Sequence, residues 1–182
     1  AVAASDAGAQ FLVAQSATAG GHYGTFTPTA LPTVLPVAEL LAAVRGVTSL
    51  PLIAAGGTAQ ASDARAALHA GAAAVSAGTA FLLADEAGTS AAHRQALTNG
   101  KFTETVITRA FTGRPARSLR NGWADRHPDA PTGYPAINRL TAELRRMAAA
   151  AGDLDRVHLW AGAGFASAQT GQAAAILDSL TP

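Results

Sequence analysis

Three short apolar runs lie in the first half of the chain, at residues 10–15, 51–55 and 73–77. Their hydrophobic residues follow one another instead of alternating with polar ones, which is typical of strands covered on both faces of a parallel sheet. Small residues and glycine follow each run. The pattern therefore predicts three buried strands, each leading into a tight turn.

Hydrophobic positions with helical spacing lie between and after these runs. The spacing, with glycines and caps at the ends, predicts helices over residues 34–45, 62–70, 90–97, 103–109, 136–151 and 171–180. Ser62 or Asp63 is the expected cap of the second helix. In the segment 136–151, one stripe holds Ile137, Leu140, Leu144 and Met147. Residues 112–134 are rich in glycine and proline and are expected to form a long irregular segment.

Strands that alternate with helices predict an α/β fold with a parallel sheet and right-handed crossovers. Three strands cannot close a (βα)8 TIM barrel, which takes about 250 residues. We therefore expect residues 1–100 to be the C-terminal part of such a barrel, and residues 101–182 to be a helical extension packed on it. The chain begins with Ala1, and Met147 is its only methionine, so we expect it to be processed, trimmed or the latter part of a longer chain.

The amino-acid composition excludes several classes of function. The 182 residues carry a net charge of +1, which gives no indication of a nucleic-acid partner. The chain has no cysteine, so disulfides, thiol nucleophiles and thiolate metal sites are excluded. One of its long uncharged stretches, residues 66–84, is broken by Gly71 and Gly78 and does not predict a membrane span. A basic leader segment is also lacking, and we expect a cytoplasmic protein.

Two glycine turns are candidates for binding phosphate. Gly56-Gly57 and Gly78-Thr79 follow neighbouring predicted strands, and the loops after the last strands of βα barrels often hold phosphate. Glycine lets main-chain N–H groups approach an anion closely, and Thr79 adds a hydroxyl. The alternative is that these glycines only permit tight turns. We favour phosphate because both turns fall at the expected end of the sheet.

Gln15 and His22 lie at the end of the first predicted strand. His22 follows Gly20-Gly21, in the region where the active sites of βα barrels lie, and a histidine there can exchange a proton near neutral pH. It can equally be a loop residue with a structural hydrogen bond. The Gln15 amide can hydrogen-bond a polar ligand ring or simply cap the strand.

The other charged residues point less clearly to chemistry. Arg109, Arg114, Arg117 and Arg120 form a basic cluster that can attract an anionic substrate, although structural pairing within the fold is the favoured interpretation. His69 falls in the last turn of a predicted helix, where a cation suits the helix dipole. The spacing of the remaining histidines, His93, His127 and His158, does not indicate a metal site.

Several of these motifs together resemble the nitronate monooxygenase family, also called 2-nitropropane dioxygenases. The resemblance is carried, in order, by Ala14-Gln15, Ala19-Gly20-Gly21-His22, Ile53-Ala54-Ala55-Gly56-Gly57, Ala77-Gly78-Thr79-Ala80-Phe81-Leu82, Ala110-Phe111-Thr112-Gly113-Arg114-Pro115-Ala116-Arg117 and Leu159-Trp160-Ala161-Gly162. It covers nearly the whole chain, which would be the C-terminal half, or slightly more, of a family member. One departure is Ser16-Ala17-Thr18, where the family often has glycine and then glutamate.

The resemblance implies an FMN enzyme that oxidises alkyl nitronates or nitroalkanes with oxygen to a carbonyl compound and nitrite. It implies that His22 is the catalytic residue beside the flavin, and that no metal is needed. The cofactor-binding residues that it implies are Gln15, Gly20, Gly21, Gly57, Ser76, Ala77, Gly78 and Thr79.

Two other functions remain open. An FMN-dependent enoyl-acyl-carrier-protein reductase shares the Gly-Gly-His, Ala-Ala-Gly-Gly and Gly-Thr turns, although the motifs beyond residue 110 favour the nitronate enzyme. The chain can also be a non-catalytic half-barrel that needs an N-terminal half, in the same chain or as a partner. The expected partners are then that half-barrel or a second copy of the chain, besides a small-molecule nitronate and oxygen.

Overall fold

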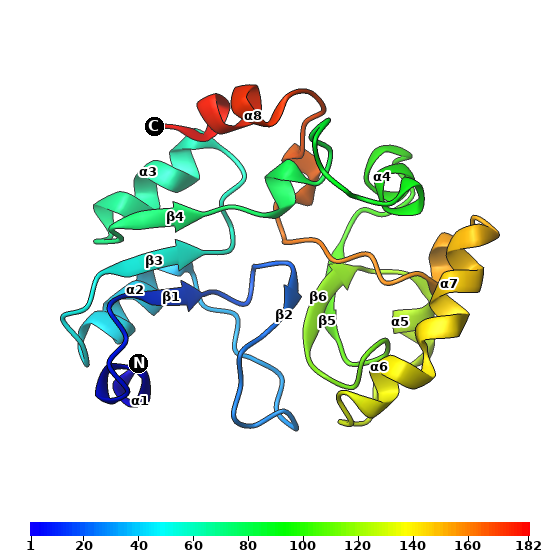
Figure 1. The fold of residues 1–182 in the computed structure, drawn as a ribbon, viewed down its shortest axis with the longest axis horizontal. Coiled ribbons are helices and arrows are strands. Elements are labelled where there is room, and N and C mark those ends of the chain that lie inside the picture. The colour runs from blue at the N-terminus through cyan, green and yellow to red at the C-terminus, as the bar shows by residue number, and fades with distance from the viewer.

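The computed structural model describes residues 1–182 and contains two sheets of three strands each (Figure 1). The first sheet is parallel, as predicted, with the order β1-β3-β4. Its strands are β1 (Leu12–Gln15), β3 (Leu52–Ala55) and β4 (Ala74–Ser76). Because all three run in the same direction, the turns after Gln15, Ala55 and Ser76 lie at one edge of the sheet.

Helices α2 (Val37–Arg45) and α3 (Ala61–His69) pack against the strands of the parallel sheet, as the sequence predicts. α8 (Ala173–Leu180) packs against α3, and the short helix α1 (Val2–Asp6) precedes β1. Leu41 of α2 and Leu52 of β3 are fully buried in a cluster that also holds Ala14, Ala54, Ala67 and Ala72. At the start of α3 the cap position is Gln60, two residues earlier than the predicted Ser62. Asp63 accepts hydrogen bonds from Ala59 N and Gln60 N, both at 2.9 Å.

The parallel sheet does not close into a barrel. β1 and β4 are its two edges, and neither pairs with another strand on its outer side. Val13 of β1 is 54% exposed, although its neighbours Ala14 and Ala54 are buried. The open edges fit the expectation that the chain supplies only some of the strands of a barrel.

The second sheet contradicts part of the prediction for residues 101–182. Residues 103–109 were expected to be helical, but Thr105–Thr108 form strand β5, because four consecutive residues (Thr, Val, Ile, Thr) are β-branched and suit a strand. The segment 112–134, expected to be irregular, contains the fully buried strand β6 (Ala116–Leu119) and the short helix α5 (Gly122–Arg126). Strand β2 (Gly21–His22) completes an antiparallel sheet in the order β2-β6-β5.

Further helices pack around this second sheet (Figure 1): α4 (Ala91–Thr98), α6 (Ala136–Leu140) and α7 (Ala142–Ala150). The expected helix 136–151 is interrupted at Thr141, whose buried hydroxyl contacts Phe111 O. Only part of the predicted apolar stripe of this segment faces the core. Ile137 and Leu144 are half-buried, and Leu140 and Met147 are exposed, whereas the most buried positions are Thr141 and Ala148. Single-turn 3₁₀ helices, η1 (Thr79–Phe81), η2 (Leu154–Arg156) and η3 (Phe165–Ser167), complete the fold.

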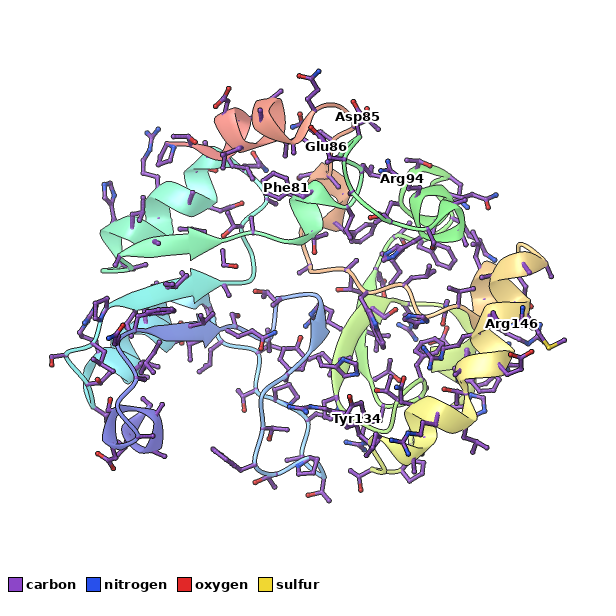
Figure 2. The ribbon with its side chains drawn as sticks, viewed as in Figure 1. Phe81, Asp85, Glu86, Arg94, Tyr134 and Arg146 are labelled. Carbon is purple, nitrogen blue, oxygen red and sulfur yellow. The ribbon has the colours of Figure 1, made fainter.

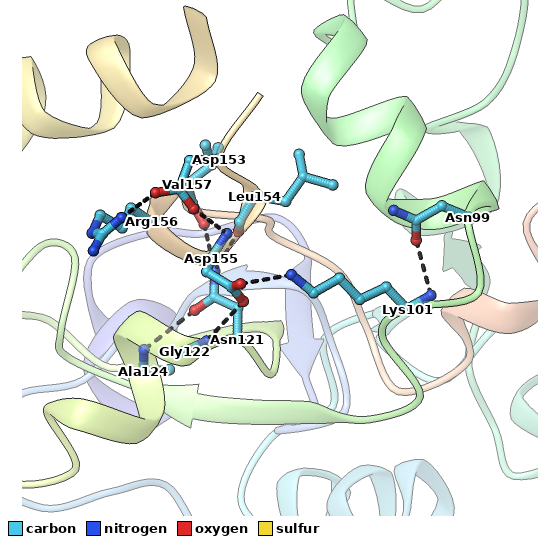
Figure 3. Close-up of polar contacts among 10 residues, drawn as sticks. All are labelled: Asn99, Lys101, Asn121, Gly122, Ala124, Asp153, Leu154, Asp155, Arg156 and Val157. Atoms are coloured by element: carbon cyan, nitrogen blue, oxygen red, sulfur yellow. Dashed lines mark hydrogen bonds and ion pairs between the residues drawn. The ribbon is translucent and has the colours of Figure 1, made fainter. Parts of the chain in front are cut away.

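Polar contacts fasten α5 to η2 (Figure 3). Asn121 caps α5 by accepting from Ala124 N, and its amide donates to Leu154 O and Val157 O. Asp155 accepts from Lys101 Nζ at 2.6 Å and from Gly122 N at 3.2 Å. Every hydrogen-bonding group of the buried Asn121 amide therefore has a partner, as burial of a polar group requires.

The loop after η1 is fixed in a similar way (Figure 2). Arg94 of α4 donates to Leu83 O at 3.0 Å and Ala87 O at 3.2 Å, and Glu86 accepts from Ala173 N at 2.8 Å. This last contact brings the start of α8 back to the parallel sheet, where Ile176 and Leu180 pack against Ala80 and Ala84. The division into residues 1–100 and 101–182 stays a prediction. β2 belongs to the first part but pairs with β6 of the second, and α8 belongs to the second part but packs against Ala80 and Ala84 of the first.

None of the helices has the length and apolar character that crossing a bilayer requires.

Substituting Leu52→Ala tests the core of the parallel sheet. Leu52 has no exposed surface, so its truncation should lower the free energy of unfolding by about 2–5 kcal/mol. The matched control, Leu140→Ala, removes a side chain that is 81% exposed and should change it by less than about 0.5 kcal/mol. Urea denaturation followed by circular dichroism measures both, and equal effects would contradict this account of the core.

Candidate functional site

A cavity of about 370 Å³ opens at the carboxyl ends of the three parallel strands. Its volume lies in the range of about 300–1,000 Å³ that is usual for small-molecule sites, and its place is where βα barrels hold their active sites. Seven of the predicted cofactor-binding residues line it: Gln15, Gly20, Gly57, Ser76, Ala77, Gly78 and Thr79. Gly21 does not line it.

Main-chain donors without partners gather at this cavity. The N–H groups of Gly57, Thr58, Gly78 and Thr79 donate no hydrogen bond within the chain. Gly57 has φ +82°, a conformation that side chains other than glycine rarely adopt. Thr79 Oγ1 accepts from Gly162 N at 2.9 Å, so its own proton stays available to a ligand. The two glycine turns thus present several donors to one space.

Gly20 contributes through its lack of a side chain. A Cβ atom at Gly20 would lie 2.7 Å from Gly162 N, and one at Gly162 would lie 2.9 Å from Thr18 O. Ala163 N also donates to Thr18 O at 2.9 Å. The turn after β1 and the segment 160–164 therefore touch backbone to backbone and form one wall of the cavity.

Sequence reasoning missed this second wall as part of the site. Trp160, Gly162 and Gly164 line the cavity, yet in the sequence Trp160 and Gly162 were noted only as part of a family motif and Gly164 was not singled out. The two glycines spaced by one residue after a tryptophan were the available indication of a close backbone approach. Their distance in sequence from the strands hid the contact.

His22 lies next to the cavity but outside its lining. It pairs with Ala116 at the start of β6, and Gln15 Nε2 donates to its carbonyl oxygen at 3.0 Å. The Gln15 amide nitrogen is thereby committed to the backbone of His22, whereas Oε1 makes no hydrogen bond within the chain. The glutamine at the end of β1 thus positions the histidine as well as lining the cavity.

The imidazole of His22 lies among aromatic rings. Its centroid is 5.2 Å from that of Trp160, which lines the cavity, and 5.8 Å from that of Tyr134. Tyr134 comes from the loop before α6 (Figure 2). The ring nitrogen Nε2 lies 2.9 Å from Thr112 Oγ1. His22 is therefore half-buried and lies beside Trp160 of the cavity lining.

Positive charge surrounds His22. Burial lowers the pKa of its imidazole, and the guanidinium groups of Arg114 and Arg145 lower that pKa further. Neither arginine pairs with a carboxylate: Arg114 donates to Tyr23 O, and Arg145 donates to Thr141, Asn138 and His158. The imidazole is therefore neutral at neutral pH, as a proton acceptor must be.

The arginine cluster has the structural role favoured in the sequence. Arg117 is 8% exposed and donates to Ala17 O at 2.7 Å and Thr105 Oγ1 at 2.8 Å. Arg109 donates to Ala130 O, and Arg120 pairs with Glu104 and Asp125. Arg120 alone pairs with acids, while the other three bond to main-chain carbonyls.

The other histidines do not form a metal site, because no group of three or more histidine or acidic residues lies close enough to hold an ion. His69 lies in the last turn of α3, as predicted. His158 Nδ1 lies 3.2 Å from Arg145 Nη1. Because a guanidinium only donates, His158 Nδ1 is the acceptor of this hydrogen bond. Burial lowers the pKa of His93, whose Nε2 has no hydrogen-bond partner.

The parallel sheet, its crossover helices and a cavity at the carboxyl ends of the strands define a mixed α/β fold that is similar to part of a βα barrel. The sequence pattern of the nitronate monooxygenase family matches residues 1–182. The chain belongs to this family, which confirms the resemblance seen in its motifs.

Individual relatives agree with the assignment. The chain is 37% identical over 186 residues to a probable nitronate monooxygenase of Staphylococcus aureus (strain Newman), covering 99% of this chain and 52% of the relative. It is 36% identical over 167 residues to a probable nitronate monooxygenase of Staphylococcus saprophyticus, covering 89% and 47%. The chain thus spans about half the length of the curated relatives it matches.

Solved structures show the same fold. Nitroalkane oxidase from Streptomyces ansochromogenes superposes with a TM-score of 0.90 at 42% identity, over 98% of this chain and 52% of that one. FabK from Thermotoga maritima superposes with a TM-score of 0.76 at 26% identity, over 98% and 55%. The fold is therefore shared with larger proteins, in which it forms about half of the chain.

His158 gives a pH-dependent prediction. Burial, and then the charges of Arg145, His93 and His22, lower the pKa of its imidazole from 6.5 to about 4. The unfolded chain takes up a proton at this residue near pH 6.5, whereas the folded chain does so only near pH 4, so protonation favours unfolding as the pH falls between these values. A ¹H–¹³C NMR titration of His158 should give a midpoint near pH 4, and a midpoint near 6.5 would show that the ring is solvated.

Proposed function

We propose that this chain forms the flavin-binding part of an enzyme that oxidises alkyl nitronates, or nitroalkanes, with oxygen to a carbonyl compound and nitrite. The observation that carries the proposal is the cavity at the strand ends, which is lined by two neighbouring turns with unpaired main-chain donors and by Trp160, whose ring centroid is 5.2 Å from that of His22. Family membership and the 42% identity to a nitroalkane oxidase support it.

FMN fits the donors that this cavity offers. A phosphate group needs several N–H and O–H donors and no nearby carboxylate, and no acidic residue lines the cavity. Gly57, Thr58, Gly78 and Thr79 would hold the phosphate, and Gln15, Gly20 and Trp160 would lie toward the flavin ring. When bound, FMN supplies the two-electron oxidation and the reaction with oxygen, which no side chain of this protein can perform.

His22 acts on the substrate side. With a neutral nitroalkane, the neutral imidazole takes the proton from the carbon next to the nitro group, and the electron pair remains on the substrate as the nitronate. With a nitronate, which is already an anion, the histidine needs only to hydrogen-bond it. The unpaired charges of Arg114 and Arg145 near this ring favour the anionic form of the substrate.

The second candidate is an FMN-dependent enoyl-acyl-carrier-protein reductase, because the cavity with its two glycine turns would hold FMN equally well in either enzyme. Two observations favour the nitronate enzyme: the family match over the full chain, and the higher identity to the nitroalkane oxidase than to FabK, 42% against 26%. Nitronate-dependent oxygen uptake, compared with NAD(P)H-dependent reduction of an enoyl thioester, separates the two.

The open edges of the parallel sheet bear on cofactor binding. β1 and β4 lack outer neighbours, and the relatives are about twice as long as this chain. We propose that the remaining strands, in the same chain or in a partner, complete the barrel and close the flavin site.

The purified 182-residue chain should accordingly bind FMN weakly or not at all, because one side of the cavity is open to solvent. Its visible absorption spectrum after gel filtration with excess FMN measures this. Adding the missing half of a family member should raise flavin retention, whereas a full complement of FMN on the chain alone would contradict the requirement for that half.

Replacing His22 tests the chemistry. In the FMN-loaded protein, His22→Asn should lower kcat/KM for a neutral nitroalkane by about 10²-fold or more, because general-base catalysis contributes about 10²–10⁴-fold. The loss for the preformed nitronate should be smaller, since no carbon-bound proton is removed. Oxygen consumption and nitrite release measure both, with His69→Asn, at the exposed end of α3, as the matched control. Equal losses of kcat/KM for the nitroalkane and the nitronate would show that His22 is not the general base.

A further inference from the structure

Thr112 makes a contact with His22 that the proposed function leaves unused. The hydroxyl oxygen lies 2.9 Å from Nε2 of the imidazole, and Thr112 is 2% exposed. It is on the turn that joins β5 to β6, whereas His22 is on β2 at the other side of β6. Two separate segments of chain therefore bring the hydroxyl and the ring together.

The turn that carries Thr112 is held firmly. Gly113 N donates to Arg109 O at 2.7 Å, and Gly133 N donates to Gly113 O at 3.0 Å. Gly113 has φ +74°, and a Cβ atom there would lie 2.8 Å from Gly133 N. The hydroxyl consequently has little freedom to move away from the histidine ring.

The direction of the bond follows from the other partners of the hydroxyl. Arg114 N donates to Thr112 Oγ1 at 3.4 Å, and Arg114 O lies 3.3 Å from the same oxygen. Arg114 O accepts no other hydrogen bond within the chain. If the hydroxyl donates to Arg114 O, it accepts from His22 Nε2–H, and all three contacts are hydrogen bonds. If it donates to Nε2 instead, Arg114 O loses its donor.

The other ring nitrogen of His22 has a different environment. Nδ1 makes no hydrogen bond within the chain, and it is not among the buried side-chain atoms that lack a partner, so it is accessible. A neutral imidazole carries its proton on one nitrogen and accepts at the other. A proton on Nε2 leaves the lone pair on the accessible nitrogen.

From this geometry we infer that Thr112 is a positioning residue that fixes the Nε2–H tautomer of His22 and so presents Nδ1 as the proton acceptor. The inference rests on the proposed function for its catalytic consequence, but the tautomer is a property of the chain itself. In the reaction with a nitroalkane, the carbon–hydrogen bond breaks, the proton goes to Nδ1, and Nε2–H remains bonded to Thr112. The imidazolium that forms donates from both nitrogens, so the Thr112 contact is kept through the step.

Nitrogen NMR of the ¹⁵N-histidine-labelled protein tests the tautomer directly. We expect a pyrrole-type shift with an attached proton at Nε2 of His22 and a pyridine-type shift at Nδ1, assigned by comparison with His22→Asn. Thr112→Ser keeps the hydroxyl and should keep this pattern. Thr112→Val has nearly the same shape without the acceptor, and should give a mixture of tautomers. A proton on Nδ1 in the unsubstituted protein overturns the inference, whatever the variants do.

Kinetics provide the second readout. With FMN bound, Thr112→Val should lower kcat for a neutral nitroalkane about tenfold, as loss of a group that orients a functional histidine does elsewhere. KM should change little, the nitronate rate should change less than the nitroalkane rate, and Thr112→Ser should recover most of the loss. Equal rates and equal tautomer ratios in Thr112→Val and Thr112→Ser would overturn the inference. Absence of nitronate oxidation in the unsubstituted chain, after it has been completed by the missing half and loaded with FMN, would refute the proposed function and leave the NMR result to decide the role of Thr112.

Discussion

The arrangement of the site depends on the turn that follows β1, because this turn joins the two sheets. Its Ala17 carbonyl accepts from the buried Arg117 guanidinium at 2.7 Å and from the Tyr23 hydroxyl at 2.6 Å. Both lone pairs of one main-chain oxygen are thereby used, and a charge buried without a carboxylate is hydrogen-bonded instead. On one side of the turn β1 pairs with β3, and on the other β2 pairs with β6. These contacts set the position of the histidine relative to the cavity.

Much of the parallel half could be predicted from the sequence, and the reason is local. Strands such as Leu52–Ala55 are short apolar runs that end at glycine, and helices such as α3 end where a glycine follows. Both features depend on neighbouring residues. Parallel pairing then places the turns at one edge, so Gly57 and Thr79 could be assigned to a shared site before their positions were known.

The antiparallel half was harder because its elements depend on distant partners. Thr105–Thr108 is too short for a periodicity to be read, and a helix was predicted where pairing with β6 makes a strand. Ala116–Leu119 contains Arg117 and Ser118, which look exposed in sequence but are buried by contacts with the turn after β1 and with Leu159. The same limit applies to Trp160, whose place in the cavity wall depends on residues about 140 positions earlier, near Gly20.

The backbone contact between Gly20 and Gly162 has a consequence for how such a site can diversify. Any side chain larger than hydrogen at either position meets main-chain atoms at under 3.0 Å, so this wall has no room to vary. Loop residues instead line a second, separate hollow beside Arg114: they include Thr25, Thr132 and Tyr134. A larger side chain can therefore be placed in these loops but not at either glycine of the wall, unless the main chain moves.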